Sequence, residues 1–416
     1  MLLPGLLSLL SLWLVLLPQA RAQQPVSQND TVYFTSGRRS INIPFKLVHN
    51  LIVIPLKINN SSSLNFILDT GVRSTLITRL FYSDSLDLKH TNRTQIRGLG
   101  TGYTIEAIIS TGNSLNLPGI KGENQEIYVL MEDIFNLSTR MGMPIHGIIG
   151  YDIFKNFIVK VNYSGKVLTL YRPDVRLKKK RKAEEYSLHI ENDKAYVYAS
   201  VRQHNGDTLQ VKLVVDTGAS HTLSLYLPTN KRLELPPKTM EAYLGRGLSG
   251  DINGKIGRLP GFSLGRYELQ NLPASYPDEE SIKAALNIAN RNGNLGSDIL
   301  KRFTVIFDYP HKRMLLLPNS KYKEPFHFNM SGFEVSTPLP GVNYYEVSYV
   351  VPNSPATAAG ILIGDELVSI NGKSCFELNL NEVLEIMESK PGRKLRLKFR
   401  RNAEVINVNL VLQSRI

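Results

Sequence analysis

Two copies of the tripeptide Asp-Thr-Gly are the strongest indication of chemistry in this 416-residue sequence. Asp69 follows the apolar run 66–68, and Asp216 follows the apolar run 213–215. A single copy would indicate only a turn at a strand end, because glycine permits the loop backbone there. Two copies at related positions indicate a pair. Two carboxyl groups about 3 Å apart share one proton, so the charged one acts as a base on water while the protonated one donates to a peptide carbonyl oxygen.

The residues that follow each Asp fit a supporting role. The hydroxyl groups of Thr70 and Thr217 are expected to donate to the backbone of the opposite copy and so join the two loops. Gly71 and Gly218 let the chain turn tightly, so that backbone N–H groups reach the carboxylates. A symmetric pair of loops would supply this arrangement.

A second pair of motifs keeps the same spacing and reveals an internal repeat. The Asp-Thr-Gly copies lie 147 residues apart, and segment 147–153 is echoed by segment 293–299 at an offset of 146. Each copy is predicted to be mostly β-strand with polar turns and to end in a hairpin. Short helical turns are expected just before these hairpins. The elements that position the two Asp residues are therefore duplicated β-rich units.

On these motifs, residues 40–318 resemble the clan AA aspartic proteases, the pepsin and retropepsin class. The resemblance implies a mainly β fold of two lobes related by a pseudo-two-fold axis, with Asp69 and Asp216 as the catalytic pair and no metal or cofactor. Segments 148–150 and 294–296 match the family's apolar-apolar-Gly strand under each Asp loop, although the second begins with Asn294. Pepsins usually carry Ser or Thr after the Asp-Thr-Gly glycine, whereas this sequence resembles retropepsins there. We therefore expect a less acidic optimum than that of pepsin.

One residue departs from the expected pattern near the first Asp. The second copy continues Ala-Ser after the glycine, but the first continues Val72-Arg73. If the guanidinium of Arg73 approached Asp69, it would hold both carboxylates ionised and remove the acid. The alternative is that Arg73 points outward and pairs with another carboxylate.

Glycine-rich segments follow each Asp-Thr-Gly by about 30 residues. They contain Gly100 and Tyr103 in the first copy and Gly247 in the second. Both segments are candidate flaps that would cover a bound peptide and exclude water. Ordinary glycine-rich turns are the alternative.

The C-terminal part of the chain has no counterpart in the repeat. Segment 353–372 resembles the bacterial PDZ pattern, which implies a domain that takes an extended peptide as an added strand and binds its C-terminal carboxylate on backbone N–H groups. The candidate carboxylate loop is Ser331-Gly332-Phe333. A predicted helix around 380–387 forms either the other wall of the groove or the core. Substrate delivery and self-regulation both remain open for such a domain.

The N-terminal segment 1–22 is predicted to be a signal peptide that ends in an Ala-Arg-Ala cleavage pattern. The alternative is an uncleaved anchor, but the apolar stretch is shorter than the ~20 residues of a membrane span. No later segment is long and apolar enough to cross a membrane, so the chain is expected to be exported to the periplasm or cell envelope of a Gram-negative bacterium, or secreted. The one cysteine, Cys375, cannot form an intrachain disulfide.

The formal net charge of +13 would allow an anionic partner, but no nucleic-acid-binding motif accompanies it. Part of the excess lies in the basic run 176–182, which is predicted to be a solvated linker. The predicted divisions are a signal peptide, an N-terminal protease lobe, a basic linker, a C-terminal protease lobe and a PDZ domain, at residues 1–22, 23–175, 176–185, 186–325 and 326–416.

The sequence thus predicts an exported aspartic endopeptidase that acts on extended polypeptide and whose PDZ domain binds peptide C-termini. The oligomeric state is not predicted. A protease-like scaffold that binds peptides without cleaving them is the alternative, which Arg73 favours. A third hypothesis is that the chain cuts itself in the basic linker.

Overall fold

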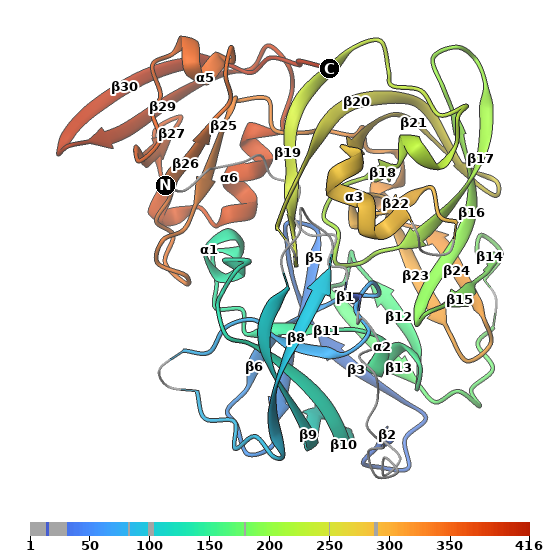
Figure 1. The fold of residues 1–416 in the computed structure, drawn as a ribbon. Helices are drawn as coiled ribbons and strands as arrows, with labels where there is room; N and C mark the ends of the chain where they lie inside the picture. The colour runs from blue at the N-terminus through green and yellow to red at the C-terminus, as the bar shows by residue number, and fades with distance from the viewer. Residues whose placement is uncertain are drawn as a thin grey trace.

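The computed structural model describes residues 14–15, 31–81, 84–98, 104–178, 180–248, 250–286 and 290–416. The predicted signal peptide, apart from Leu14–Val15, lies outside the described residues, as do the flap candidates Gly100 and Tyr103. Figure 1 shows two β-rich lobes, with a third, smaller domain at the C-terminal end of the chain beside them.

Lobe 1 is built on a strongly bent sheet whose strands are not in chain order. Pairing of β5 (Leu51–Ile58) with β9 (Ile105–Leu117) closes the sheet on itself. Two further strands join it, β1 (Leu14–Val15) beside β8 (Thr91–Gly98) and β2 (Thr31–Phe34) beside β10 (Ile120–Leu130). The spatial order is β4 (Lys46–Val48), β5 (Leu51–Ile58), β6 (Leu64–Leu68), β11 (Gly147–Ile149), β7 (Thr75–Ile77), β10 (Ile120–Leu130), β9 (Ile105–Leu117) and β8 (Thr91–Gly98).

Lobe 2 repeats this sheet strand for strand, and the pairing of β16 with β20 closes it in the same way. The identical order confirms the two-lobed, mainly β architecture that the internal repeat predicts. The order is β15 (His189–Glu191), β16 (Lys194–Arg202), β17 (Thr208–Val215), β22 (Gly293–Leu295), β18 (Leu223–Leu225), β21 (Tyr267–Pro277), β20 (Gly250–Leu264) and β19 (Thr239–Gly247).

A third sheet joins the lobes. Its two central strands come one from each lobe and pair antiparallel, with Lys160 opposite Ile306. The order is β14 (Glu184–Ser187), β24 (Arg313–Pro318), β23 (Phe303–Asp308), β12 (Ile158–Asn162), β13 (Val167–Tyr171) and β3 (Ser40–Pro44). Lobe 1 therefore supplies half of this sheet and lobe 2 the other half.

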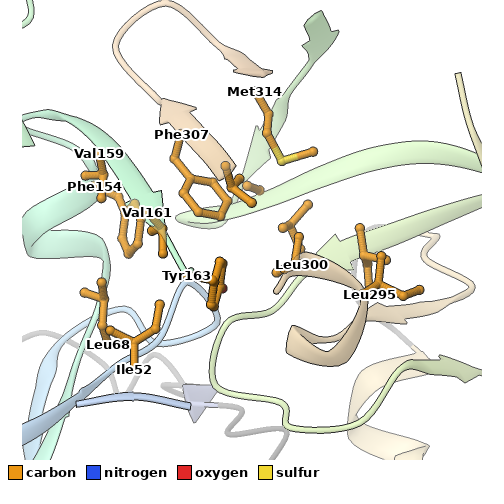
Figure 2. Close-up of a cluster of buried hydrophobic side chains, with 14 of the residues drawn as sticks. Ile52, Leu68, Phe154, Val159, Val161, Tyr163, Leu295, Leu300, Phe307 and Met314 are labelled. Atoms are coloured by element: carbon orange, nitrogen blue, oxygen red, sulfur yellow. The ribbon is translucent and has the colours of Figure 1, made fainter. Parts of the chain in front are cut away.

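The two lobes share one hydrophobic core, which includes side chains of this sheet. Figure 2 shows Phe154, Val159 and Val161 of lobe 1 facing Leu300 and Phe307 of lobe 2. The rings of Phe154 and Phe307 meet edge to face at 5.3 Å between centroids. Burial of aromatic and branched side chains contributes about 1.5–3 kcal/mol each, so the interface stabilises the lobes as one body.

Short helices follow the strands under the Asp loops, as the sequence predicts. They are α2 (Tyr151–Phe154) in lobe 1 and α4 (Ser297–Leu300) in lobe 2. In both, a Lys three residues after an Asp forms an ion pair, Lys155 with Asp152 and Lys301 with Asp298. The other short helices of the lobes are α1 (Leu137–Met141), η1 (Leu227–Thr229), α3 (Glu279–Leu286) and η2 (Ser320–Lys323).

The C-terminal domain has its own core and its own sheet, with β25 (Phe333–Ser336) at one edge. Its longest helix, α6 (Leu380–Met387), begins with a capping box in which Asn379 and Glu382 bond each other's backbone. The strand order is β25 (Phe333–Ser336), β26 (Glu346–Val350), β27 (Glu366–Ile370), β29 (Lys394–Arg401) and β30 (Glu404–Val411), with β28 (Lys373–Ser374) beside β27. The remaining helices of this domain are α5 (Pro355–Ala358) and η3 (Cys375–Glu377).

Both lobes contact this domain, lobe 2 through an apolar cluster that includes Val351 and Ile416, and lobe 1 through hydrogen bonds. Asn381 of α6 accepts from the backbone N–H of His49 at 3.2 Å and donates to the Leu47 carbonyl at 2.8 Å. The Thr337 N–H and hydroxyl both donate to the carbonyl of Thr139 in α1. A cavity of about 630 Å³ lies between α6 and the two lobes, with most of its lobe residues in lobe 2. Among the described residues, no helix has the length and apolar character needed to cross a membrane.

Candidate functional site

The strands β6 and β17 deliver the two Asp residues to the centre of the molecule. The N–H of Asp69 donates to the Ile149 carbonyl at 2.8 Å, and the N–H of Asp216 donates to the Leu295 carbonyl at 2.9 Å. Each Asp loop is therefore held by the parallel strand that crosses beneath it, β11 or β22. A Cβ atom at Gly150, at the end of β11, would lie 1.9 Å from the Asp69 carbonyl oxygen, so only glycine fits there.

Thr70 and Thr217 link the two loops in both directions. The N–H of Thr70 donates to the Thr217 hydroxyl at 3.0 Å, and the N–H of Thr217 donates to the Thr70 hydroxyl at 2.9 Å. Each hydroxyl also donates across the interface. That of Thr70 donates to the Val215 carbonyl at 2.6 Å, and that of Thr217 donates to the Leu68 carbonyl at 2.9 Å. Because both threonines are buried, these bonds face no competition from water and fix the spacing of the loops.

The same exchange brings the two carboxyl groups together. Asp69 and Asp216 are buried, and their carboxyl groups lie close enough to influence each other's ionisation. The Gly71 N–H donates to Oδ1 of Asp69 at 2.6 Å, and the Gly218 N–H donates to Oδ1 of Asp216 at 3.1 Å. A Cβ atom at Gly218 would lie 2.2 Å from Cγ of Asp69, so the glycine leaves room for the carboxyl group of the other lobe.

The environment opposes two negative charges in this space. Burial raises the pKa of Asp69 and of Asp216 above the ordinary carboxyl range, and a negative charge on either carboxyl group opposes ionisation of the other. The N–H donors of Gly71 and Gly218 act in the opposite sense. The geometry therefore favours one shared proton on the pair.

Two buried cations lie near the pair, and neither was identified from the sequence. Lys194, at the start of β16, has a pKa lowered to about 7 by burial and by the charge of Arg291, while Asp216 and Asp69 oppose that shift. The register of the sheets gives Lys194 the place that Leu51 occupies in lobe 1. The signal available in the sequence is a lysine at the position where the other copy has a leucine.

Arg73, by contrast, does not approach the pair. Its Nε lies 2.9 Å from a carboxylate oxygen of Asp193, and its side chain is 56% exposed. The outward orientation therefore holds, and the guanidinium of Arg73 does not fix both carboxylates in the ionised state.

Asn294, the departure from the family pattern, contacts the second Asp. Its side-chain amide donates to Oδ2 of Asp216 at 2.9 Å. At the matching position lobe 1 has Ile148, which is buried in an apolar cluster. Within the part of the chain that the structure describes, no three His, Cys, Asp or Glu side chains are grouped so as to hold a metal ion.

The hairpin β19–β20 carries Gly247 at its end and reaches across to lobe 1. Gly247 pairs with Gly250, so the turn between them is tight. Leu248 at the tip is 1% exposed and packs into a cluster made otherwise of lobe 1 residues. Arg140 of α1 donates to the Tyr243 hydroxyl at 3.4 Å and so contacts the same hairpin.

The predicted carboxylate loop of the C-terminal domain begins edge strand β25. The N–H of Ser331 donates to Oδ1 of Asn329 at 3.0 Å, and the N–H of Phe333 donates to the Ser331 hydroxyl at 3.3 Å. Gly332 adopts a left-handed backbone with φ of 83°, which glycine favours. The neighbouring Glu334 and the helix residue Leu384 line the cavity that faces lobe 2.

Comparison with known proteins agrees with this geometry. An aspartyl protease family model matches residues 54–153 and 199–299, which is one match for each lobe, and a PDZ domain model matches residues 346–401. The chain is also similar to the carboxy-terminal processing protease CtpA of Bacillus subtilis (strain 168), with 36% identity over 63 residues. That match covers 15% of this chain and 13% of the relative. The matches support an architecture of two retropepsin-like aspartyl protease lobes followed by a PDZ domain.

Proposed function

We propose that this protease is an aspartic endopeptidase that hydrolyses peptide bonds in extended polypeptide with the pair Asp69 and Asp216. The observation that carries the proposal is the contact between these two buried carboxyl groups, one from each lobe. The reciprocal bonds of Thr70 and Thr217 support it, because they hold the groups at a fixed spacing.

One proton and one negative charge on the pair suffice for the reaction. The ionised carboxylate takes a proton from a water molecule as the water oxygen attacks the peptide carbonyl carbon. The protonated carboxyl group gives its proton to the carbonyl oxygen. When the C–N bond breaks, the first carboxyl group protonates the leaving nitrogen and the second recovers its proton, so the pair returns to its starting state.

The hairpins of the two lobes serve as flaps over the bound peptide. The β19–β20 hairpin supports this role, because its tip spans from lobe 2 to lobe 1 and buries Leu248 there. A cover of this kind excludes water from the reacting bond and strengthens the interactions of the buried charges. Gly100 and Tyr103 would belong to the corresponding hairpin of lobe 1.

The PDZ domain recruits the C-termini of polypeptides through Ser331, Gly332 and Phe333, and the protein acts outside the cytoplasm after removal of residues 1–22. The edge position of β25 supports the first statement, since a peptide adds to a free strand edge. The Ala-Arg-Ala pattern at residues 20–22 supports the second.

A peptide-binding scaffold without activity is the second candidate function, because Lys194 favours the ionised forms of both acids. Cleavage of casein and of a peptide library between about pH 3 and about pH 8 separates the two. We expect cleavage by the wild type and a loss of roughly 1000-fold or more in Asp216→Asn. Asp207→Asn, the same change at an exposed aspartate of lobe 2, is the matched control. Peptide binding without cleavage by the wild type would establish the scaffold instead.

A further inference from the structure

A line of directional hydrogen bonds ends at one of the two carboxyl groups. Arg291 donates to the Tyr226 hydroxyl at 3.3 Å, Tyr226 donates to Oδ1 of Asn294 at 3.1 Å, and the Asn294 amide donates to Oδ2 of Asp216 at 2.9 Å. All four residues are at most 1% exposed. No solvent competes with these bonds, so each is stronger than it would be at the surface.

The direction of every bond follows from the first residue. A guanidinium group has donors only, so the Tyr226 oxygen must accept from Arg291 and is left with its own proton to give. That proton requires an acceptor, which fixes the oxygen of the Asn294 amide towards Tyr226. The NH₂ group of Asn294 must then face Asp216, and Oδ2 of Asp216 can only accept.

Among the residues of lobe 1 that the structure describes, no equivalent of this line is present. Ile148 occupies the place of Asn294, as the matching glycines Gly147 and Gly293 before them show. Asp216 therefore receives an N–H donor at each carboxylate oxygen, from Gly218 and from Asn294. The strand beneath Asp69 offers only an apolar side chain.

We propose that Asn294, oriented by Tyr226 and Arg291, is a positioning residue that makes Asp216 the ionised member of the pair and leaves the shared proton on Asp69. The inference rests on the proposed function. It assigns the two roles that the symmetric motifs leave open. Asp216 takes the proton of the attacking water and later delivers it to the leaving nitrogen, whereas Asp69 donates to the carbonyl oxygen and recovers that proton as the C–N bond breaks.

Other charged or titratable groups face the pair as well, namely Lys194, Arg291, Tyr226 and Tyr309. All four belong to lobe 2, on or beside four different strands, and they act on the pair whether or not Asn294 is present. A change confined to Asn294 therefore isolates the contribution of its amide.

The test is the pH dependence of kcat/KM in Asn294→Ile, which introduces the residue of lobe 1. A hydrogen bond to a charged group is lost, so we expect the acidic limb to move up by about one to two pH units. The alkaline limb should stay nearly in place, because Asp216 is ionised both before and after the second proton leaves. An acidic limb that does not move, or acidic and alkaline limbs that move together, would overturn the assignment.

Tyr226→Phe provides a second variant with little change in packing. It frees the Asn294 amide to turn, so a smaller shift of the same limb is expected, and no further shift when it is combined with Asn294→Ile. Ile148→Val in lobe 1 is the control that should leave the profile unchanged. Thermal unfolding of each variant establishes that it is folded.

A measurement without turnover separates this inference from the proposed function. In ¹³C NMR of protein labelled at the aspartate carboxyl carbons, with signals assigned by Asp69→Asn and Asp216→Asn, Asp216 should ionise at lower pH than Asp69. The order should reverse or the difference shrink in Asn294→Ile. If the wild type cleaves nothing but shows this order, the proposed function fails and the assignment stands. If it cleaves peptides and Asp69 ionises first, the assignment fails alone.

Discussion

At the scale of single residues, the two halves of the site differ more than their motifs suggest. Both lobes present the same Asp-Thr-Gly, and the same threonine bonds join them. The differences lie one layer below, where lobe 2 places Lys194, Arg291 and Asn294 around its own Asp. Protonation of the pair is therefore governed by residues outside the motif.

Removing the charge of Lys194 should move both limbs of the activity profile. Its ammonium group favours the ionised forms of Asp69 and Asp216, so Lys194→Met raises the pKa of both. We expect the acidic limb to move up by about one pH unit and the alkaline limb by less, because Lys194, whose pKa is about 7, carries its full charge only on the acidic side. The pH dependence of kcat/KM measures the shift.

Arg73→Met is the matched control for this substitution. It removes the same charge from the first Asp loop, but Arg73 pairs with Asp193 and is half exposed. Its profile should resemble that of the wild type. An equal shift in both variants would show that overall charge, and not the position of Lys194, acts on the pair.

The sequence predicts the paired acids and marks Asn294 as a departure, because both follow from comparing one copy with the other. It does not predict the contacts of Tyr226 or Arg291. Tyr226 lies directly after β18 and Arg291 shortly before β22, and their side chains meet only when these strands pair. Such contacts depend on the folded sheet and leave no spacing pattern along the chain.

At the scale of elements, the hairpin β19–β20 connects the lobes through one side chain. Leu248→Ala removes most of the apolar surface that the hairpin tip buries in lobe 1. We expect faster hydrogen exchange at the ends of β19 and β20, and a lower kcat because the cover over the cleft opens more often. Hydrogen exchange followed by mass spectrometry measures the first effect.

Leu235→Ala is the control for the hairpin, because Leu235 is also in lobe 2 but 39% exposed. It should leave hydrogen exchange in β19 and β20 as in the wild type. Unchanged exchange in Leu248→Ala would contradict the idea that this leucine holds the hairpin down.

The repeat predicts most of the elements but not how they close the molecule. Matching glycines and apolar runs indicate equivalent strands, and the two sheets have the same order. The docking of Leu248 into lobe 1 was not foreseen, because a buried leucine and an exposed one look alike in a glycine-rich turn. Its environment is supplied by residues a hundred or more positions away.

At the scale of the whole molecule, an ionisable residue lies where the PDZ domain faces the two lobes. Glu388, at the C-terminal end of α6, lines the cavity that faces lobe 2. Burial raises its pKa from 4.5 to about 7, although the charge of Lys301 opposes the shift. The folded protein therefore holds this proton more tightly than the unfolded chain does.

The sign of the effect on stability follows from this difference. The contribution of Glu388 is fully present below about pH 4.5 and is lost as the pH rises to about 7. Glu388→Gln removes this loss. The free energy of unfolding of the variant should therefore exceed that of the wild type by on the order of 1–3 kcal/mol at about pH 8, and by much less at about pH 4. Thermal unfolding at both pH values, with Glu404→Gln on the exposed strand β30 as control, measures it. Equal gains at both pH values would count against a titrating Glu388.

The sheet that runs through both lobes also has a consequence for how this protein could change over time. In a symmetric homodimer, each mutation of the gene appears on both sides of the two-fold axis. Here the halves are continuous through β12 and β23, yet each has its own codons. An asparagine could therefore arise under one acid while an isoleucine stayed under the other, so that two identical nucleophile-activating groups could take up different duties.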